Sequence, residues 1–341
     1  MASIHPRYIP RDPEEPQSLA STIQVLRASD NQKFLATKIP NMVCKDAIQM
    51  DKSKSKISTN LATAILPTAA LSLSRILNHP NIISLVDVVH KSVEEGNFSG
   101  NLGKHSDITN FQRFSLPESL CWHVLRSISR ALLWLHFGIK ETIGIPGEWM
   151  PHDDDWMPIL IMDVTPSQIW FKRALNGETY GECKLGGFQQ ARVTGMYGGR
   201  MALAECDRGQ PRRKQYFWAP EIYNNTTSWT RPSEIYSLGA ALYTMMTGIP
   251  PPRFYSHNWQ ISRLNDKGFS PGLREIVGKM LMQHPADRPT ALDIVNKCEI
   301  EWRRWRAETT EGRRVVDVED ARVLRTALGP NPPALGLLGG L

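Results

Sequence analysis

The chain has 341 residues, of which 41% are hydrophobic, and carries a formal net charge of +6. This is enough for an ordinary packed core, in one large unit of two lobes or in two modest domains. Five widely spaced cysteines argue against a disulfide framework and a zinc site, and there is neither a signal-like start nor a run of about 18 apolar residues. The basic clusters are short, so we expect an intracellular protein of the cytoplasm or nucleus, with no nucleic-acid partner and no membrane partner.

The N-terminal third predicts little regular structure beyond one hairpin. Residues 1–20 hold four prolines and alternating charges, which is typical of a disordered lead-in. Residues 22–40 contain strong β-formers on both sides of the polar turn 28–33, and this pattern predicts two strands. The polar, glycine-punctuated segment 90–114 predicts mainly loop.

A helix is predicted over residues 115–138, and a long loop follows it. Ser115 and Glu118 have the spacing of a capping box, and apolar residues then recur at helical intervals. The loop 139–158 contains His152 followed by three aspartates, which could suggest metal ligands. Adjacent residues on a loop cannot all point at one ion, so we interpret them as a solvated turn and predict no metal site there.

The C-terminal half predicts a buried helix and two amphipathic ones. The stretch 233–248 is apolar nearly all round, as in a helix enclosed by other helices, and Gly248 predicts its end. Amphipathic helices are predicted over 270–283 and 290–306. In the second of these, Thr290 and Asp293 predict a capping box.

Three motifs in this half carry a family resemblance. They read YFWAPE at 216–221, SEIYSLGAALYTMMTG at 233–248 and HPADRPTAL at 284–292. Their order resembles the large lobe of a eukaryotic protein kinase of the serine/threonine type, with the end of the activation segment, the central helix and the motif before the last helices. The resemblance implies an α+β fold of two lobes, a small β-rich N-lobe that is truncated and a large helical C-lobe.

The same resemblance divides the chain into four parts. After the lead-in of residues 1–20, residues 21–112 correspond to the N-lobe and hinge, and residues 113–306 to the C-lobe. Residues 307–341 end in a Pro/Gly-rich sequence and are expected to form a flexible tail.

Three charged residues of the large lobe are expected to be structural. The family ties the end of its activation segment to its last helices by an ion pair, and Glu221 and Arg288 occupy those two positions. If this pair is buried, removal of one partner should cost about 3–5 kcal/mol. Glu234, at the start of the central helix, is a further structural candidate.

The nucleotide-binding half of the resemblance is incomplete. Lys38, in Ala36-Thr37-Lys38, matches the lysine that holds the phosphates of ATP in the family. No glycine occurs between residues 1 and 95, so the glycine-rich loop over the phosphates is missing. Residues 59–89 resemble the regulatory helix, the HPNI turn and the next strand, but Ala70 stands where the helix should carry the glutamate that pairs with this lysine.

The catalytic positions are also only partly kept. By resemblance, Asp163 is the base that accepts the proton of the substrate hydroxyl, while Thr165 replaces a lysine that neutralises the phosphate. Gln168 stands where an asparagine holds magnesium, and Gly187 stands where an aspartate holds it, next to the retained Phe188. The nearest acids that could substitute, if their loops fold back, are Glu182 and Asp207.

These losses favour a pseudokinase that acts by binding an unidentified protein partner. The resemblance implies ATP and Mg²⁺ as cofactors, but the missing groups argue against tight binding of either. The alternative is an active ATP-dependent serine/threonine kinase with an unusual metal site, in which Asp163 is the base and Lys38 holds the phosphates. A third alternative is an incorrect gene model in which an intron error removed the glycine-rich loop and the hinge strand together.

Overall fold

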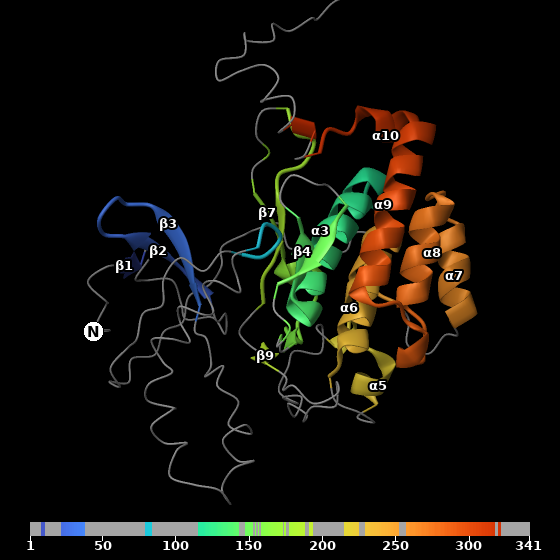
Figure 1. Cartoon of the computed structure of the whole chain (residues 1–341), viewed down its shortest axis with the longest axis horizontal. Coiled ribbons are helices and arrows are strands. Elements are labelled where there is room, and N and C mark those ends of the chain that lie inside the picture. Colours follow the sequence, from blue (N-terminus) through green and yellow to red (C-terminus); the bar gives the residue numbers. More distant parts are fainter. Residues whose placement is uncertain are drawn as a thin grey trace, which may run out of the picture.

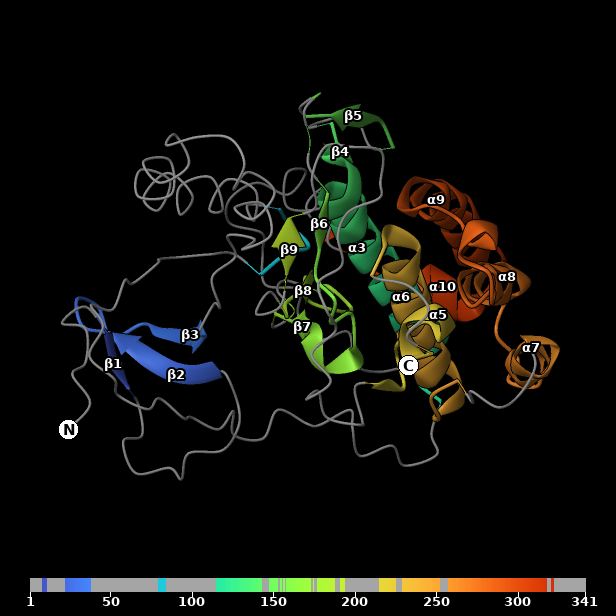
Figure 2. The same ribbon diagram turned by 90° about the horizontal axis from the view of Figure 1, so that it is seen from below.

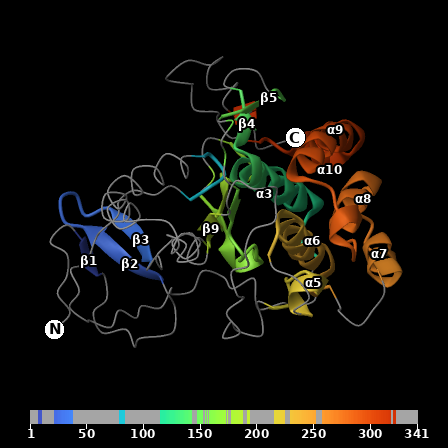
Figure 3. The same cartoon turned by 60° about the horizontal axis from the view of Figure 1, so that its bottom comes forward.

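The computed structural model places a small sheet on one side of a larger helical body (Figure 1). It describes residues 8–10, 22–37, 79–83, 115–142, 147–152, 154, 156, 158–172, 174, 177–187, 191–193, 215–224, 229–251, 257–317, 320 and 321. The views in Figures 2 and 3 agree that the short strands β6 to β9 lie between the small sheet and the helices. This is the two-lobed α+β arrangement that the sequence predicts.

The small sheet has three antiparallel strands in the order β1-β2-β3. They are β1 (Tyr8–Pro10), β2 (Thr22–Arg27) and β3 (Lys33–Thr37). The predicted hairpin is confirmed, with its turn closed by a hydrogen bond from the Asn31 amide to the Arg27 carbonyl. Strand β1 lies inside the stretch 1–20, for which we expected no structure. Tyr8 and Ile9 are strong β-formers, and a proline is tolerated because β1 is an edge strand.

The helical lobe is built around α3, which packs against α6 and α9 (Figure 1). Its helices are α3 (Glu118–Phe137), α5 (Pro220–Tyr223), α6 (Arg231–Thr247), α7 (His257–Asn265), α8 (Pro271–Met280), α9 (Ala291–Glu308) and α10 (Thr310–Arg314). Between α3 and α9, Trp122 packs against Trp302 and Trp305, with ring centroids 6.2 and 6.4 Å away. These helices therefore share one core.

Helix α6 is buried from Ser233 to Thr247, as its uniformly apolar sequence predicts. It ends at Gly248, whose φ of 78° is the left-handed conformation that favours glycine. Gly239, in its middle, lets α8 approach closely, because a Cβ there would lie 2.8 Å from Met280 Cβ. A side chain at this position would have to push the two helices apart.

The predicted capping box at the start of α3 does not form. Pro117 is the N-cap and supplies no side-chain cap, while the Ser119 amide donates to Glu311 Oε1 of α10 (3.1 Å). The Glu118 carboxylate instead accepts hydrogen bonds from Trp122 Nε1 (3.1 Å) and from the Ser270 amide (3.0 Å) before α8. The prediction from Ser115 and Glu118 was wrong because the Glu118 side chain bonds to Trp122 and Ser270 instead of capping the helix locally.

The long connection after α3 contains a hairpin. Strand β4 (Ile139–Glu141) pairs with β5 (Trp149–Pro151). Beyond it, the Trp156 ring packs 4.7 Å from that of Trp134, and Trp156 Nε1 donates to the Leu135 carbonyl (3.1 Å). The insertion thus folds back onto the last turn of α3.

Two further strand pairs frame the loop that follows. They are β6 (Ile159–Leu160) with β9 (Arg192–Val193), and β7 (Ile169–Phe171) with β8 (Cys183–Leu185). The HPNI turn, residues 79–82, contacts β8 of the second pair, since Ile82 bridges Leu185 in parallel and Asn81 Nδ2 donates to the Cys183 carbonyl (3.1 Å). This turn of the N-terminal half is therefore fastened to the large lobe.

The C-terminal segment differs from the flexible tail expected from residue 307. The capping box of Thr290 and Asp293 starts α9 as predicted, but the helix runs on to Glu308 and α10 follows. Beyond α10, Val315 and Asp317 are buried against the lobe. The prediction rested on the Pro/Gly-rich end of the sequence, whereas residues 309–317, just after α9, contain one glycine and no proline. Within the described residues, the helices are too short or too polar to cross a membrane.

Candidate functional site

The loop between β6 and β7 is anchored to the central helix by Glu234. This carboxylate is fully buried, and its Oε1 accepts hydrogen bonds from the amides of Ile161 (2.5 Å) and Met162 (2.7 Å). Its Oε2 lies 2.7 Å from His136 Nε2 on α3. A buried carboxylate needs such partners to offset its desolvation. Glu234 therefore fixes the loop to both α6 and α3.

Met162 takes a conformation that is costly for a residue other than glycine. Its φ is 59°, in the left-handed region, and its side chain is buried. Such a backbone typically costs on the order of 1–3 kcal/mol and persists only where the surroundings impose it. The two amides held by Glu234 flank this turn, and the next residue is Asp163.

Asp163 is buried and both of its carboxylate oxygens accept hydrogen bonds. Thr165 Oγ1 donates to Oδ1 (3.2 Å), and Gln168 Nε2 donates to Oδ2 (3.1 Å). Ser167 Oγ lies 2.9 Å from Thr165 Oγ1, so a chain of hydroxyls leads from the exposed Ser167 to the carboxylate. The candidate base is in place, with a side-chain amide directed at it.

Gly187 and Gln168 lie next to each other at the open end of the β7–β8 hairpin. Gly187 has a φ of +84°, and a Cβ built on it would lie 3.0 Å from Gln168 Cγ and 3.1 Å from its Cδ. The Gly186 amide donates to the Gln168 carbonyl (2.8 Å), which keeps the two segments in register. The longer side chain at position 168 occupies the space that a side chain at position 187 would need.

Among the described residues, those at this position do not make up the ligand set of a magnesium ion. Asp163 is the carboxylate that contacts Gln168 there, and Mg²⁺ demands near-octahedral oxygen ligation, usually with carboxylates and phosphates. Glu182, proposed as a substitute acid, is turned to Lys172 (2.8 Å) and Lys184 (3.3 Å). Across the described part of the chain, no group of three or more His, Cys, Asp or Glu side chains could hold a metal ion. Lys38, Phe188 and Asp207 lie outside the described residues.

Lys184 is a buried lysine that the sequence did not single out. Its Nζ donates to the Pro80 carbonyl in the HPNI turn (2.6 Å) and lies near Glu182. Burial lowers its pKa, and the nearby Glu182 carboxylate only partly opposes this. Its position in β8 alternates with apolar residues, so the sequence offers no signal for this contact.

The predicted ion pair between Glu221 and Arg288 is present and buried. Arg288 Nη1 and Nη2 donate to the two carboxylate oxygens at 2.7 and 2.8 Å. Ser233 Oγ also donates to Glu221 (3.0 Å), and Arg288 Nε donates to the Met282 carbonyl (2.7 Å). The pair ties α5 to the start of α6 and to the segment after α8.

Comparisons with known proteins give weak but consistent matches. No family model matches the chain. It is 23% identical over 275 residues to the G2-specific protein kinase nim-1 of Neurospora crassa, covering 74% of this chain and 30% of that protein. It is 23% identical over 246 residues to the serine/threonine-protein kinase Nek1 of Toxoplasma gondii (66% and 14%), and 24% identical over 300 residues to the serine/threonine-protein kinase atg1 of Aspergillus niger (75% and 28%). The matched region spans less than a third of each relative.

A structural comparison agrees with these relatives. The crystal structure of the Rad53 kinase domain and SCD2 matches with a TM-score of 0.50 and 16% identity, covering 91% of this chain and 97% of that one. The match shows the protein-kinase fold, with a helical large lobe and few strands in the small one.

Proposed function

Because the chain belongs to the protein kinase superfamily, we propose that it is a pseudokinase, which binds another protein and transfers phosphate poorly or not at all. The single observation that carries the proposal is the Gly187–Gln168 pair. The position that should supply a metal-binding carboxylate has no side chain, and the space beside it is filled by a neutral amide.

The size of the expected loss supports this proposal. Phosphoryl transfer is catalysed mainly by positioning and by stabilisation of charge. Loss of one preorganised electrostatic contact typically costs about 2.7–4 kcal/mol, or roughly a hundred- to a thousandfold in rate. In this chain positions 165, 168 and 187 all differ from the family pattern. Such losses are not additive, but efficient transfer by the usual route is not expected.

The surroundings of Asp163 point the same way. A general base must reach the proton that it removes. Here Gln168 Nε2 and Thr165 Oγ1 already donate to the two oxygens of this carboxylate. These two contacts give the buried Asp163 carboxylate hydrogen-bond partners without a metal or a substrate, as expected of a site with a structural role.

The intact parts of the large lobe support a binding role. In the buried networks of Glu221 with Arg288 and of Glu234 with its two amides, both oxygens of each carboxylate accept hydrogen bonds or contact a charged or polar partner. The chain keeps what holds the lobe together and loses what holds magnesium. We propose an unidentified protein as its partner.

The first test is the melting temperature of the full chain with and without ATP, in magnesium and in EDTA. A ligand at about 100 times its dissociation constant stabilises the native state by about 2.7 kcal/mol, which shifts the transition by a few degrees. We expect no magnesium-dependent shift. A shift that is equal in EDTA would indicate a pseudokinase that binds nucleotide without metal.

A second candidate function is an active serine/threonine kinase with an unusual metal site. The observation in its favour is that Asp163 is retained and held in a defined position. A magnesium-dependent shift, followed by phosphate transfer that disappears in both Lys38→Met and Asp163→Ala, would establish it and refute the pseudokinase proposal.

A further inference from the structure

The segment after α9 is bound to the large lobe at several points. We call residues 309–317, with Asp320 and Ala321, the C-terminal strap. It begins with a sharp reversal, in which Thr309 Oγ1 accepts from the Gly312 amide (2.9 Å) and donates to the Trp305 carbonyl (2.9 Å). A Cβ on Gly312 would lie 2.7 Å from Arg306 Cα, so the reversal requires glycine. The strap therefore leaves α9 in a fixed direction.

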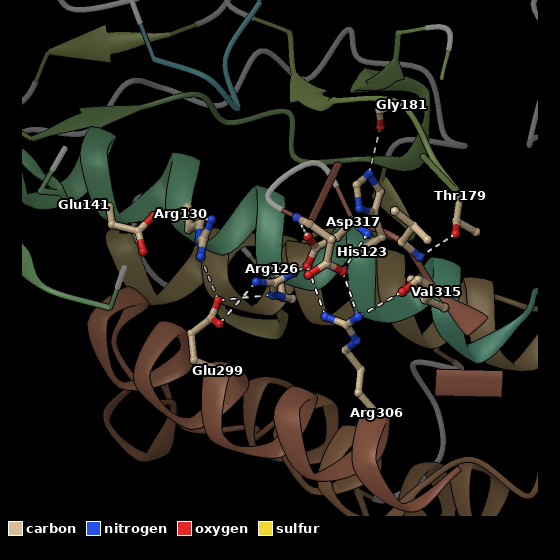
Figure 4. Close-up of polar contacts among 12 residues, drawn as sticks. His123, Arg126, Arg130, Glu141, Thr179, Gly181, Glu299, Arg306, Val315 and Asp317 are labelled. Atoms are coloured by element: carbon tan, nitrogen blue, oxygen red, sulfur yellow. Dashed lines mark hydrogen bonds and ion pairs between the residues drawn. The ribbon is translucent and has the colours of Figure 1, made fainter. Parts of the chain in front are cut away.

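The strap pairs with the turn that joins β7 to β8 (Figure 4). The Val316 amide donates to Thr179 Oγ1 (2.8 Å), and the Thr179 amide donates to the Val316 carbonyl (2.8 Å). The same turn also contacts α3, where His123 Nε2 lies 2.9 Å from the Gly181 carbonyl. The turn is thus bound both to α3 and to the strap.

Two carboxylates of the strap contact α3: Glu311 Oε1 accepts from the Ser119 amide (3.1 Å), and Asp317 binds Arg126. Asp317 Oδ2 accepts from Arg126 Nη1 on α3 (3.0 Å), and its Oδ1 accepts from the Asp320 amide (2.8 Å). Burial raises the pKa of Asp317, but the hydrogen bond from Asp320 and the charge of Arg126 outweigh it, so this pKa lies below its ordinary value. Arg306 adds a contact to Asp320 (2.7 Å).

The Arg126 charge beneath the strap stays paired if Asp317 leaves. Arg126 also donates from Nε and Nη2 to both oxygens of Glu299 (3.1 and 3.2 Å), and Glu299 is shared with Arg130 (2.9 Å). Figure 4 shows that this row of alternating charges continues from Arg130 to Glu141 in β4. Release of Asp317 would not strand an unpaired buried charge, which is the usual obstacle to opening an ionic contact.

We propose that this face, formed by α3, the C-terminal end of α9 and the turn 177–182, is a docking surface that the chain's own C-terminal strap occupies as a releasable clamp. The clamp acts on the β7–β8 hairpin, whose two strands follow Gln168 and precede Gly187. The strap is thereby a positioning element for the Gln168–Gly187 pair. The proposal does not depend on whether nucleotide binds.

The test is hydrogen exchange measured by mass spectrometry on the full chain and on two variants. Asp317→Asn keeps the shape of the side chain but removes the charge, and Thr179→Ala removes the acceptor of the Val316 amide. We expect reciprocal effects: exchange in 177–187 faster by about tenfold in Asp317→Asn, and exchange in 315–317 faster by a similar factor in Thr179→Ala. Glu308→Gln, at an exposed site at the end of α9, is the matched control.

Two results would overturn the proposal. Asp317→Asn could accelerate exchange in the strap and leave 177–187 at the wild-type rate, which would mean that the strap does not clamp the hairpin. Alternatively, both variants could match Glu308→Gln, which would mean that these contacts do not hold the strap. Melting temperatures of all three variants, with exchange in α6 as an internal reference, separate release of the strap from global destabilisation.

Discussion

At the residue scale, the contact between Gly187 and Gln168 predicts that the two positions are energetically coupled. Gly187→Ala meets both an unfavourable φ and the Gln168 side chain, and should destabilise the protein by about 1–3 kcal/mol. In a Gln168→Ala background the steric part should disappear. Urea denaturation of the two single variants and the double variant measures this coupling.

Gly177 offers a matched control for this cycle. It has a φ of +86°, but a Cβ built on it meets no atom within 4 Å. Gly177→Ala should therefore show the backbone cost alone, and should be unaffected by Gln168→Ala. Equal costs at positions 177 and 187 would contradict the packing described for Gln168.

Buried His79 predicts a loss of stability in mild acid. Its pKa is lowered from 6.5 to about 3, chiefly by burial and then by the cations of Arg130, Lys184 and Lys140. Its Nδ1 accepts from the Asn81 amide (3.1 Å), which requires an unprotonated nitrogen. A depressed pKa stabilises the fold above the unfolded value, and this contribution is lost as the pH falls from 6.5 toward 3.

The variant His79→Asn isolates this contribution, because its side-chain oxygen can still accept from the backbone without titrating. Between about pH 7 and about pH 5, the urea midpoint of unfolding should fall further in the wild type than in the variant. Parallel changes in the two proteins would show that His79 is not responsible.

At the scale of elements, the ion pair of Glu221 and Arg288 predicts that α5, α6 and the segment after α8 depend on one another. Arg288→Ala removes the charged partner of the buried Glu221 carboxylate, to which the Ser233 hydroxyl still donates, and should cost about 3–5 kcal/mol. Thermal or urea unfolding measures this loss. As a control, Lys297→Met removes the pairs of this exposed lysine with Glu275 and with Glu301, which keeps its pair with Arg304, and should cost at most about 1 kcal/mol. Similar losses in the two variants would mean that the buried pair contributes no more than a surface pair.

Individual elements differ in how far their sequence determines them. Helix α6 and its end at Gly248 are evident from a run of apolar residues that leaves no polar face. The absence of a capping box at the start of α3 is not evident from the sequence. The amide that donates to the Glu118 carboxylate belongs to Ser270, 152 residues away. The proximity of Gln168 and Gly187 depends on the pairing of β7 with β8. The ion pair of Asp317 depends on Arg126, 191 residues earlier in the chain. Local patterns predict elements, whereas the site is made by contacts between elements.

At the scale of the whole molecule, the pseudokinase proposal predicts that function survives loss of the candidate base. Asp163→Asn removes the charge with little change in shape, so the folded lobe and its partner-binding surface should persist. Cellular complementation, with a melting curve to verify folding, is the measurement. Loss of cellular function in a correctly folded variant would count heavily against the proposal.

The distribution of tryptophans has a consequence for how unfolding is observed. All ten lie at or after Trp122, including the cluster of Trp122, Trp302 and Trp305 between α3 and α9. Tryptophan fluorescence, excited selectively at long wavelength, is therefore a spectroscopic signal of the large lobe alone, and the small sheet unfolds without changing it directly. Far-ultraviolet circular dichroism detects both lobes. Where the two signals give different midpoints, the small lobe has melted on its own, and a single free energy of unfolding no longer describes the chain.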